Sequence, residues 1–177
     1  MAVCYTTRVV DGTSRPAPSY VFTRFVLLRL LGLVYAVAFL ILIQQQGPLL
    51  GHDGILPVDA FLADVRGALG STAAGARALP TLFWIDASDA TRQIAAWVGL
   101  GLAVAVLFGA TNALVQLALW ALYLSFVQVG QLFYGYGWET QLCETGFLAI
   151  LLCPVRTVGP FASPPPTAVV WLYRWLI

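Results

Sequence analysis

The chain has 177 residues, of which 60% are hydrophobic and only 10% are charged. Soluble globular domains are roughly 45–50% apolar and about 25% charged, so this composition excludes an ordinary water-soluble fold. We therefore expect lipid to surround most of the surface, and we expect an all-α, polytopic helical membrane protein. The net charge of +1 lacks the basic stripe that nucleic acids require, which excludes a nucleic-acid partner.

The first predicted elements are a polar tail and a spanning helix. Residues 1–23 are rich in Ser, Thr and Pro, which predicts a flexible tail, and residues 24–177 form the predicted transmembrane domain. The apolar stretch 26–43 is long enough to cross a hydrocarbon layer of ~30 Å. Arg29 lies near its start, where the side chain can extend to the headgroups. A cleaved signal peptide is the alternative, but no small-x-small cleavage site follows, so we predict a retained helix.

The loop that follows contains a turn and an amphipathic helix. His52 and Asp53 stand in the sequence HDG, which is typical of a turn. A metal site is the alternative, but metal sites need three or four ligands at matching spacing, so we predict no metal and no cofactor. Apolar residues of 57–69 recur at helical spacing, which predicts an amphipathic helix that begins after Pro57. This helix either lies in the membrane surface or covers the end of the bundle.

An uncharged run follows from residue 93 to residue 138. As one helix it would extend about 69 Å, over twice the thickness of the hydrocarbon layer, so it must fold back on itself. Gly and Asn tolerate the backbone angles that end helices, which places the turn at 109–112. The predicted spans are 94–109 and 113–134, and Asp89 is the expected N-cap of the first.

Small and polar residues mark the expected helix contacts of this hairpin. Ala95, Gly99 and Ala103 recur every four residues, which allows close helix approach. A polar stripe occupies one third of the circumference of the second helix and consists of Ser125, Gln128 and Gln131. Such a stripe should face protein or water. Hydrogen bonds between helices are the first interpretation of this stripe, and a polar cavity for a ligand is the second.

Two acids follow the hairpin, at a position where the composition still predicts membrane. Glu139 comes just after the interfacial Trp138, so we expect a solvated carboxylate. Glu144 precedes the uncharged stretch 145–155, which is too short to span and predicts a re-entrant or bundle-covered segment. On one helix the two acids diverge by about 140° and cannot face each other. We predict that Glu144 pairs with Arg29 or with Arg174.

The end of the chain and the distribution of arginines complete the prediction. An apolar helix begins near residue 168 and stops after ten residues, so we expect an incomplete bundle and a fragment. Cys143 and Cys153 are expected to be buried free thiols, since on one helix they would lie about 15 Å apart. Four arginines lie before or within the start of the first span and three lie in the loop that follows it, which favours a cytosolic N-terminus.

Four segments carry a distinctive pattern. They are RLLGLVYAVAFL (29–40), LLGHDGILPV (49–58), LPTLFWIDASD (79–89) and, most specific, LWALYLSFVQVGQLFYGYGWETQLCETGFLAILLCP (119–154). Together they resemble the lipase maturation factor family. Gln141 and Cys143 depart from the Leu-rich pattern that the family has between the two acids. The resemblance implies a polytopic membrane protein that helps secreted lipases fold, and a more distant likeness connects such regions with vitamin K-dependent carboxylases.

The resemblance implies a non-enzymatic factor for protein maturation, whose partners are the lipid bilayer and a client lipase. The expected location is the endoplasmic reticulum membrane in a eukaryote and the inner membrane in a bacterium. The structural or interaction residues are expected among the side chains already singled out: Glu144, Trp138, Glu139, Gln128, Gln131, Arg29, His52 and Asp53. Two alternatives remain: a carboxylase-like enzyme that uses Glu144 or His52, and a transporter piece lined by Gln128 and Gln131.

Overall fold

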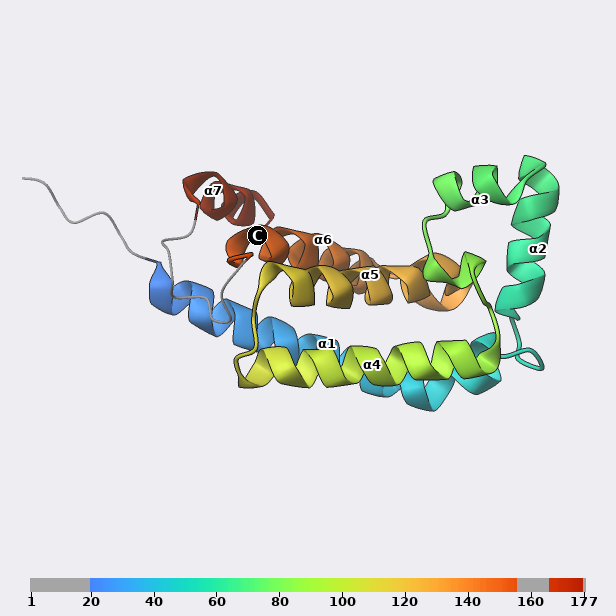
Figure 1. Ribbon diagram of the computed structural model, residues 1–177, viewed down its shortest axis with the longest axis horizontal. Helices are drawn as coiled ribbons and strands as arrows, with labels where there is room; N and C mark the ends of the chain where they lie inside the picture. The colour runs from blue at the N-terminus through green and yellow to red at the C-terminus, as the bar shows by residue number, and fades with distance from the viewer. Residues whose placement is uncertain (1–19, 156–165, 177) are drawn as a thin grey trace, which may run out of the picture.

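The computed structural model describes residues 20–155 and 166–176, and every regular element within those ranges is a helix (Figure 1). The elements are α1 (Val21–Leu50), α2 (Val58–Leu69), α3 (Thr72–Ala78), η1 (Leu82–Trp84), α4 (Asp89–Phe108), α5 (Ala113–Val129), η2 (Gln131–Tyr134), α6 (Gly137–Leu152) and α7 (Thr167–Leu176). The predicted all-α class is confirmed. Residues 1–19, which make up most of the predicted tail, lie outside the described residues.

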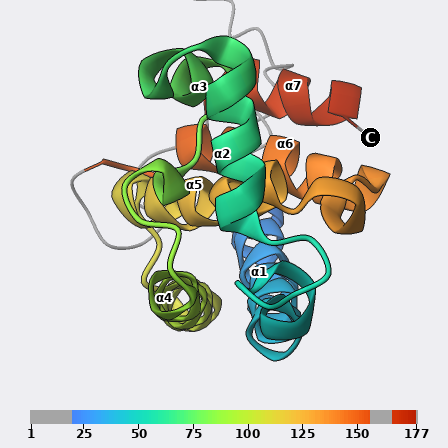
Figure 2. The same cartoon turned by 90° about the vertical axis from the view of Figure 1, so that its right-hand side faces the viewer.

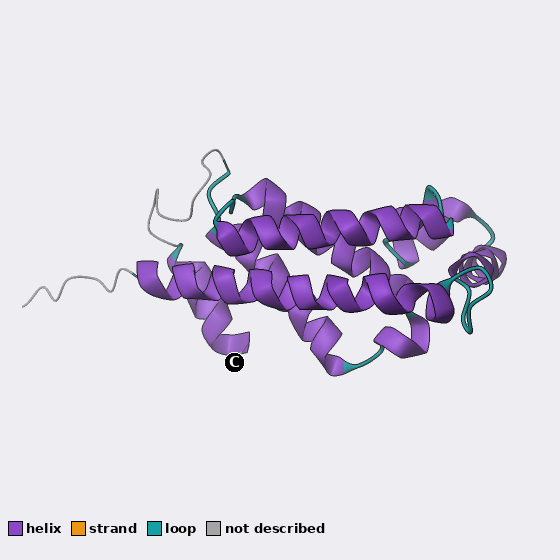
Figure 3. Cartoon of the chain, turned by 90° about the horizontal axis from the view of Figure 1, so that it is seen from below, coloured by secondary structure: helices purple, strands orange, loops and turns teal. Residues whose placement is uncertain are grey.

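Four helices form a bundle in two layers. The two longest, α1 and α4, run antiparallel in one layer, and α5 and α6 run antiparallel in the other (Figures 1 and 3). The amphipathic helix α2 crosses one end of the bundle at a steep angle to its axis (Figure 2). The short helix α7 lies against α6 at the opposite end. The helix predicted at 57–69 is expected either to lie in the membrane surface or to cover the end of the bundle, and in the structure it covers the end of the bundle.

The outer surface of the bundle is apolar. By length and composition, α1 and α4 are the two described helices that are able to cross a membrane, and α5 is a shorter apolar helix. Large apolar side chains project outward from them: Leu30, Leu33, Val37, Leu40, Ile94, Trp97, Val98, Phe108, Leu114 and Leu117 are exposed. A soluble monomer rarely leaves so much contiguous apolar surface open to water, so this exposure fits a surface that lipid covers.

The turn between α4 and α5 lies where the sequence predicts it. Gly109 has a φ of +122°, a value that residues with a Cβ rarely adopt. The Oδ1 atom of Asn112 accepts the N–H of Val115 at 2.8 Å and caps α5. The prediction for the start of α4 is wrong, because the N-cap is Ser88, whose Oγ accepts the N–H of Thr91.

The close contact between α1 and α4 depends on one glycine in each helix, Gly32 in α1 and Gly99 in α4. A Cβ at Gly32 would lie 2.9 Å from the backbone nitrogen of Leu107, and a Cβ at Gly99 would lie 2.3 Å from the ring of Phe39. Gly99 and Ala103 are both buried, which confirms two of the three predicted small contact residues, whereas Ala95 is half-buried. The missing side chains let the two backbones approach each other closely.

Aromatic rings fill the space between the two layers. Tyr35 and Phe39 of α1 meet Tyr123 of α5 edge to face, with ring centroids 5.5 Å and 5.7 Å away. Phe126 packs against Phe39 in the same way and reaches Phe83 of η1 at 4.9 Å. One aromatic column therefore connects α1, α5 and the loop, at geometries that favour ring pairs.

We predict that Gly99→Leu lowers the melting temperature of the detergent-purified protein by about 2–12 °C. The new side chain would overlap the buried ring of Phe39, and overpacking of a core typically costs ~1–3 kcal/mol. Gly101→Leu is the matched control, because no atom lies within 4 Å of a Cβ at Gly101. Equal melting temperatures for the two variants would contradict the packing described here.

Candidate functional site

The loop between α1 and α4 is folded onto one end of the bundle. Val58 and Leu62 of α2 are buried, as is Phe83 of η1. The hydroxyl of Thr81 donates to the carbonyl oxygen of Ser125 at 3.1 Å, and the N–H of Leu82 donates to Ser125 Oγ at 3.1 Å. The loop is thus an ordered cover of the bundle, not a flexible connection.

The polar stripe of α5 serves this docking. The Oγ and the carbonyl oxygen of Ser125 accept hydrogen bonds from the loop. The Gln131 amide donates to the carbonyl oxygen of Leu56 at 3.2 Å. Gln128 is half-buried. Protein contact is therefore the interpretation that holds for Ser125 and Gln131, but their partners are the Thr81 hydroxyl and backbone groups of the loop and not another spanning helix.

A hollow with acidic walls lies on the outer side of the cover. It has a volume of about 450 Å³ and is lined by His52, Asp59, Asp86, Ala87, Ser88 and Asp89. The Nδ1 atom of His52 lies 2.7 Å from Asp59 Oδ2, and the backbone N–H of His52 donates to Asp89 Oδ1 at 3.1 Å. The HDG turn is closed by the N–H of Gly54 on the carbonyl oxygen of Gly51 at 2.9 Å, as predicted for a turn.

Three side chains hold Asp86 and Asp89 of the hollow in place. Asp89 forms an ion pair with Arg92, whose guanidinium is buried and also donates to the carbonyl oxygen of Ala87. Asp86 accepts hydrogen bonds from the hydroxyls of Ser88 and Thr91. The hollow therefore presents ordered carboxylates, which suit a cationic or hydrogen-bond-donating group of a partner.

The hydrogen bonds shift the pKa values in this hollow. The hydrogen bond and charge of Asp59 raise the pKa of His52 above its ordinary 6.5, and the hydrogen bond from His52 lowers the pKa of Asp59 below 3.8. Hydrogen bonds from Thr91 and Ser88 lower the pKa of Asp86. Among the described residues, no three His, Cys, Asp or Glu side chains are grouped so that they would hold a metal ion. Asp53 is exposed, and its negative charge also raises the pKa of His52.

The structure reverses the predicted environments of the two α6 acids. Glu139 is only 2% exposed, and its Oε2 has no hydrogen-bond partner among the described residues. It lines a cavity of about 160 Å³ together with Gln45, Tyr134 and Trp138. The prediction of a solvated Glu139 is wrong because α6 begins at Gly137, well before residue 145, and turns this side chain toward α1 and α5.

Glu144 is exposed on the other face of α6, so the expected divergence of the two acids is confirmed. The predicted pairing of Glu144 with an arginine is wrong. Arg29 donates to the carbonyl oxygen of Val106 at 2.6 Å, and Arg174 donates to the Tyr20 hydroxyl at 2.8 Å. The ion pairs of the described part of the chain are His52–Asp59 and Arg92–Asp89. Cys143 and Cys153 are buried free thiols, as expected.

Comparison with known proteins decides the family. The family model described as the lipase maturation factor transmembrane domain matches residues 22–177. The chain belongs to the lipase maturation factor family. It is 41% identical to lipase maturation factor 1 of Bos taurus over an alignment 179 positions long. The alignment covers 94% of this chain and 32% of that protein.

Other relatives are named lipase maturation factor 1 or lipase maturation factor 2. The chain is 44% identical to lipase maturation factor 1 of Mus musculus over 163 residues, 88% of this chain and 28% of that protein. It is 33% identical to lipase maturation factor 2 of Xenopus tropicalis over 154 residues, 81% of this chain and 21% of that protein. The chain thus spans about a third or less of the length of these relatives. No solved structure matches it.

These matches confirm the resemblance read from the four sequence segments, and they do not favour the carboxylase-like alternative. The matched region is named a transmembrane domain, which agrees with the two apolar helices of spanning length. The protein is therefore a helical membrane protein. The hollow of His52 and the buried Glu139 both lie within the matched region.

We predict that His52 titrates above its ordinary pKa and that Asp59→Asn returns it toward 6.5, as measured by NMR of the labelled imidazole. The His52 contribution to stability is present below pH 6.5 and is lost as the pH rises through the raised pKa. The Asp59 contribution is present above pH 3.8 and is lost as the pH falls through the lowered pKa. The pair therefore stabilises the turn most between the ordinary pKa of Asp59, 3.8, and the ordinary pKa of His52, 6.5.

Asp64 is an exposed acid of α2 that lies outside the hollow, so Asp64→Asn is the control and should leave the titration of His52 unchanged.

Proposed function

We propose that this chain acts in the maturation of secreted lipases as part of an integral membrane factor. The observation that carries the proposal is the match of the lipase maturation factor transmembrane domain to residues 22–177, together with relatives of that name. In this role the protein contacts a client and does not transform a substrate. Its membrane is the endoplasmic reticulum in a eukaryote, or the inner membrane in a bacterium.

The charges at the two ends of the bundle support one orientation. Arg24, Arg29 and Arg174 lie at the end where α1 begins and α6 finishes. The opposite end carries the loop, which contains Arg66, Arg77 and Arg92. Counted along the sequence, Arg8 and Arg15 precede α1 and Arg156 follows α6, so six of the nine arginines belong to segments that flank the first end and three belong to the loop. Arginine-rich ends stay in the cytosol, so the loop and its hollow face the lumen, where secreted clients fold.

The acidic hollow is the proposed contact for a client. Its carboxylates are held by Arg92, Ser88 and Thr91, so they need little reordering when a partner binds. The loop that carries them is anchored to α5 through Ser125. A cationic segment of a folding lipase is the chemistry that fits this surface.

The orientation is tested by one substitution. Gly70→Asn creates the acceptor sequence Asn-Ser-Thr at the exposed junction of α2 and α3, where Gly70 has a φ of +76° that asparagine tolerates. We expect glycosylation in microsomes, seen as a mobility shift that glycosidase removes. The only native asparagine, Asn112, is followed by Ala and Leu and gives no background. Adding Thr72→Ala is the control that abolishes the site, and an unmodified Gly70→Asn protein would show the reverse orientation.

The function is tested in cells that lack their own lipase maturation factor and express a secreted lipase. We expect the chain to raise the lipase activity in the medium per amount of lipase protein. Asp59→Asn combined with Asp86→Asn should reduce this gain by about two- to fivefold, since each exposed charge contributes up to ~1 kcal/mol. Asp64→Asn is the control. No gain in specific activity from a correctly inserted chain would overturn the proposal.

A further inference from the structure

A buried guanidinium at the arginine-rich end of the bundle lacks most of its partners. Arg24 of α1 is only 3% exposed, and its Nη1 donates to the carbonyl oxygen of Leu152 at 3.3 Å. Its Nε and Nη2 have no hydrogen-bond partner in the described part of the chain. An arginine stays charged, and an unpaired buried charge is strongly unfavourable, so these two donors call for an anion.

The two free donors have a defined geometry. Nε–H and Nη2–H lie on the same edge of the planar guanidinium and form the fork that binds two oxygens of one phosphate or carboxylate. Arg24 lines a cavity of about 180 Å³, and Tyr20, Tyr173 and Arg174 also line it. At ~30 Å³ for each water-sized group, this is room for about six such groups, enough for a phosphate. The second arginine makes the cavity selective for a net negative headgroup.

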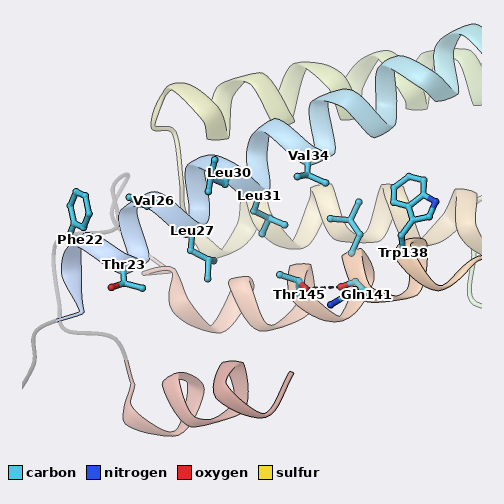
Figure 4. Close-up of a pocket in the computed structure, with 11 residues that line it drawn as sticks. Phe22, Thr23, Val26, Leu27, Leu30, Leu31, Val34, Trp138, Gln141 and Thr145 are labelled. Carbon is cyan, nitrogen blue, oxygen red and sulfur yellow. Dashed lines mark hydrogen bonds between the residues drawn. The ribbon is translucent and has the colours of Figure 1, made fainter. Parts of the chain in front are cut away.

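An apolar groove begins where the cavity ends. The groove has a volume of about 660 Å³ and lies between α1 and α6 (Figure 4). Thr23 and Leu27 belong to the walls of both the cavity and the groove. The α1 side of the groove follows one stripe of the helix, which consists of Phe22, Val26, Leu30 and Val34.

The length of this groove matches one leaflet. Val34 lies twelve positions after Phe22, which at ~1.5 Å per residue is about 18 Å along the helix. Half of a ~30 Å hydrocarbon layer is about 15 Å. The groove runs from the arginine end of α1 toward the middle of the helix, where Trp138 stands at its far end. A charged group in the cavity and a hydrocarbon chain in the groove would therefore have the orientation of a phospholipid in that leaflet.

We propose that Arg24 and Arg174 bind the phosphate of an anionic phospholipid, whose acyl chain lies in the groove between α1 and α6. The arginine end is the one that the charge bias assigns to the cytosol, and the cytosolic leaflet carries the anionic lipids. The site lies at the opposite end of the bundle from the acidic hollow. It does not depend on lipase maturation.

The test measures the melting temperature of the detergent-purified chain with added lipid. Phosphatidylglycerol should raise it clearly, and phosphatidylcholine with the same acyl chains should raise it less. Arg24→Gln should weaken the response to phosphatidylglycerol about tenfold or more in lipid concentration, since a hydrogen bond to a charged group is worth ~1.5–3 kcal/mol. Arg66→Gln removes the same charge from an exposed position on α2 and should respond like the unaltered chain.

The design separates a lipid site from a structural role of Arg24. Without lipid, Arg24→Gln should melt at or above the temperature of the unaltered chain, because the substitution removes an unpaired buried charge. Inorganic phosphate alone should have little effect, because it has no chain to occupy the groove. Equal stabilisation by phosphatidylglycerol in Arg24→Gln and in the unaltered chain would overturn the proposal. Equal stabilisation by inorganic phosphate and by phosphatidylglycerol would overturn the assignment to a lipid.

Discussion

The antiparallel contact of α1 with α4 is the constraint on which the other contacts depend. Lipid offers no hydrogen-bond partners, so a polar side chain or a carbonyl that its own helix does not satisfy must find a partner on a neighbouring helix. A close approach of the two helices makes such contacts possible. Gly32 and Gly99 allow this approach, and the ring of Phe39 occupies the space that a side chain at Gly99 would take. Both ends of the pair are then closed by polar side chains. Arg29 reaches the carbonyl oxygen of Val106 at one end, and the amide of Gln46 donates to Gln93 at 2.7 Å at the other.

The start of α1 serves two helix ends at once. Arg29 binds a carbonyl in the last turn of α4, and Arg24 binds the last carbonyl of α6. Helix C-termini carry partial negative charge and free carbonyl oxygens, so cations are favourable there. Arg24 is the deeper of the two and keeps two unused donors. Arg29 thus satisfies a carbonyl at the end of α4. Arg24 satisfies a carbonyl at the end of α6 and keeps two N–H donors that the proposed ligand would use.

The two ends of the bundle therefore have different chemistry. One end gathers arginines, an apolar groove and a small cavity, which suit a lipid headgroup. The other end gathers carboxylates on an ordered loop, with Phe83 and Thr81 anchored on α5. Glu139 lies on the α6 face that packs into the bundle, and it lines a cavity together with the buried Tyr134 and the exposed Gln45. A membrane factor that holds a lipid on one side and meets a secreted client on the other would require this separation.

The sequence by itself determined the helical class, the hairpin turn at Gly109 and Asn112, and the amphipathic helix after Pro57. Each of these follows from local chemistry: apolar composition, backbone freedom and a helical period. The tertiary structure decided which face of each helix is buried. Glu139 and Glu144 show why, because both stand in similar sequence surroundings and only the packing of α6 against α1 and α5 turns one inward and the other outward. Arginine partners were equally undetermined, since Arg24 and Arg29 bind backbone carbonyls, and carbonyl oxygens carry no signature in a sequence.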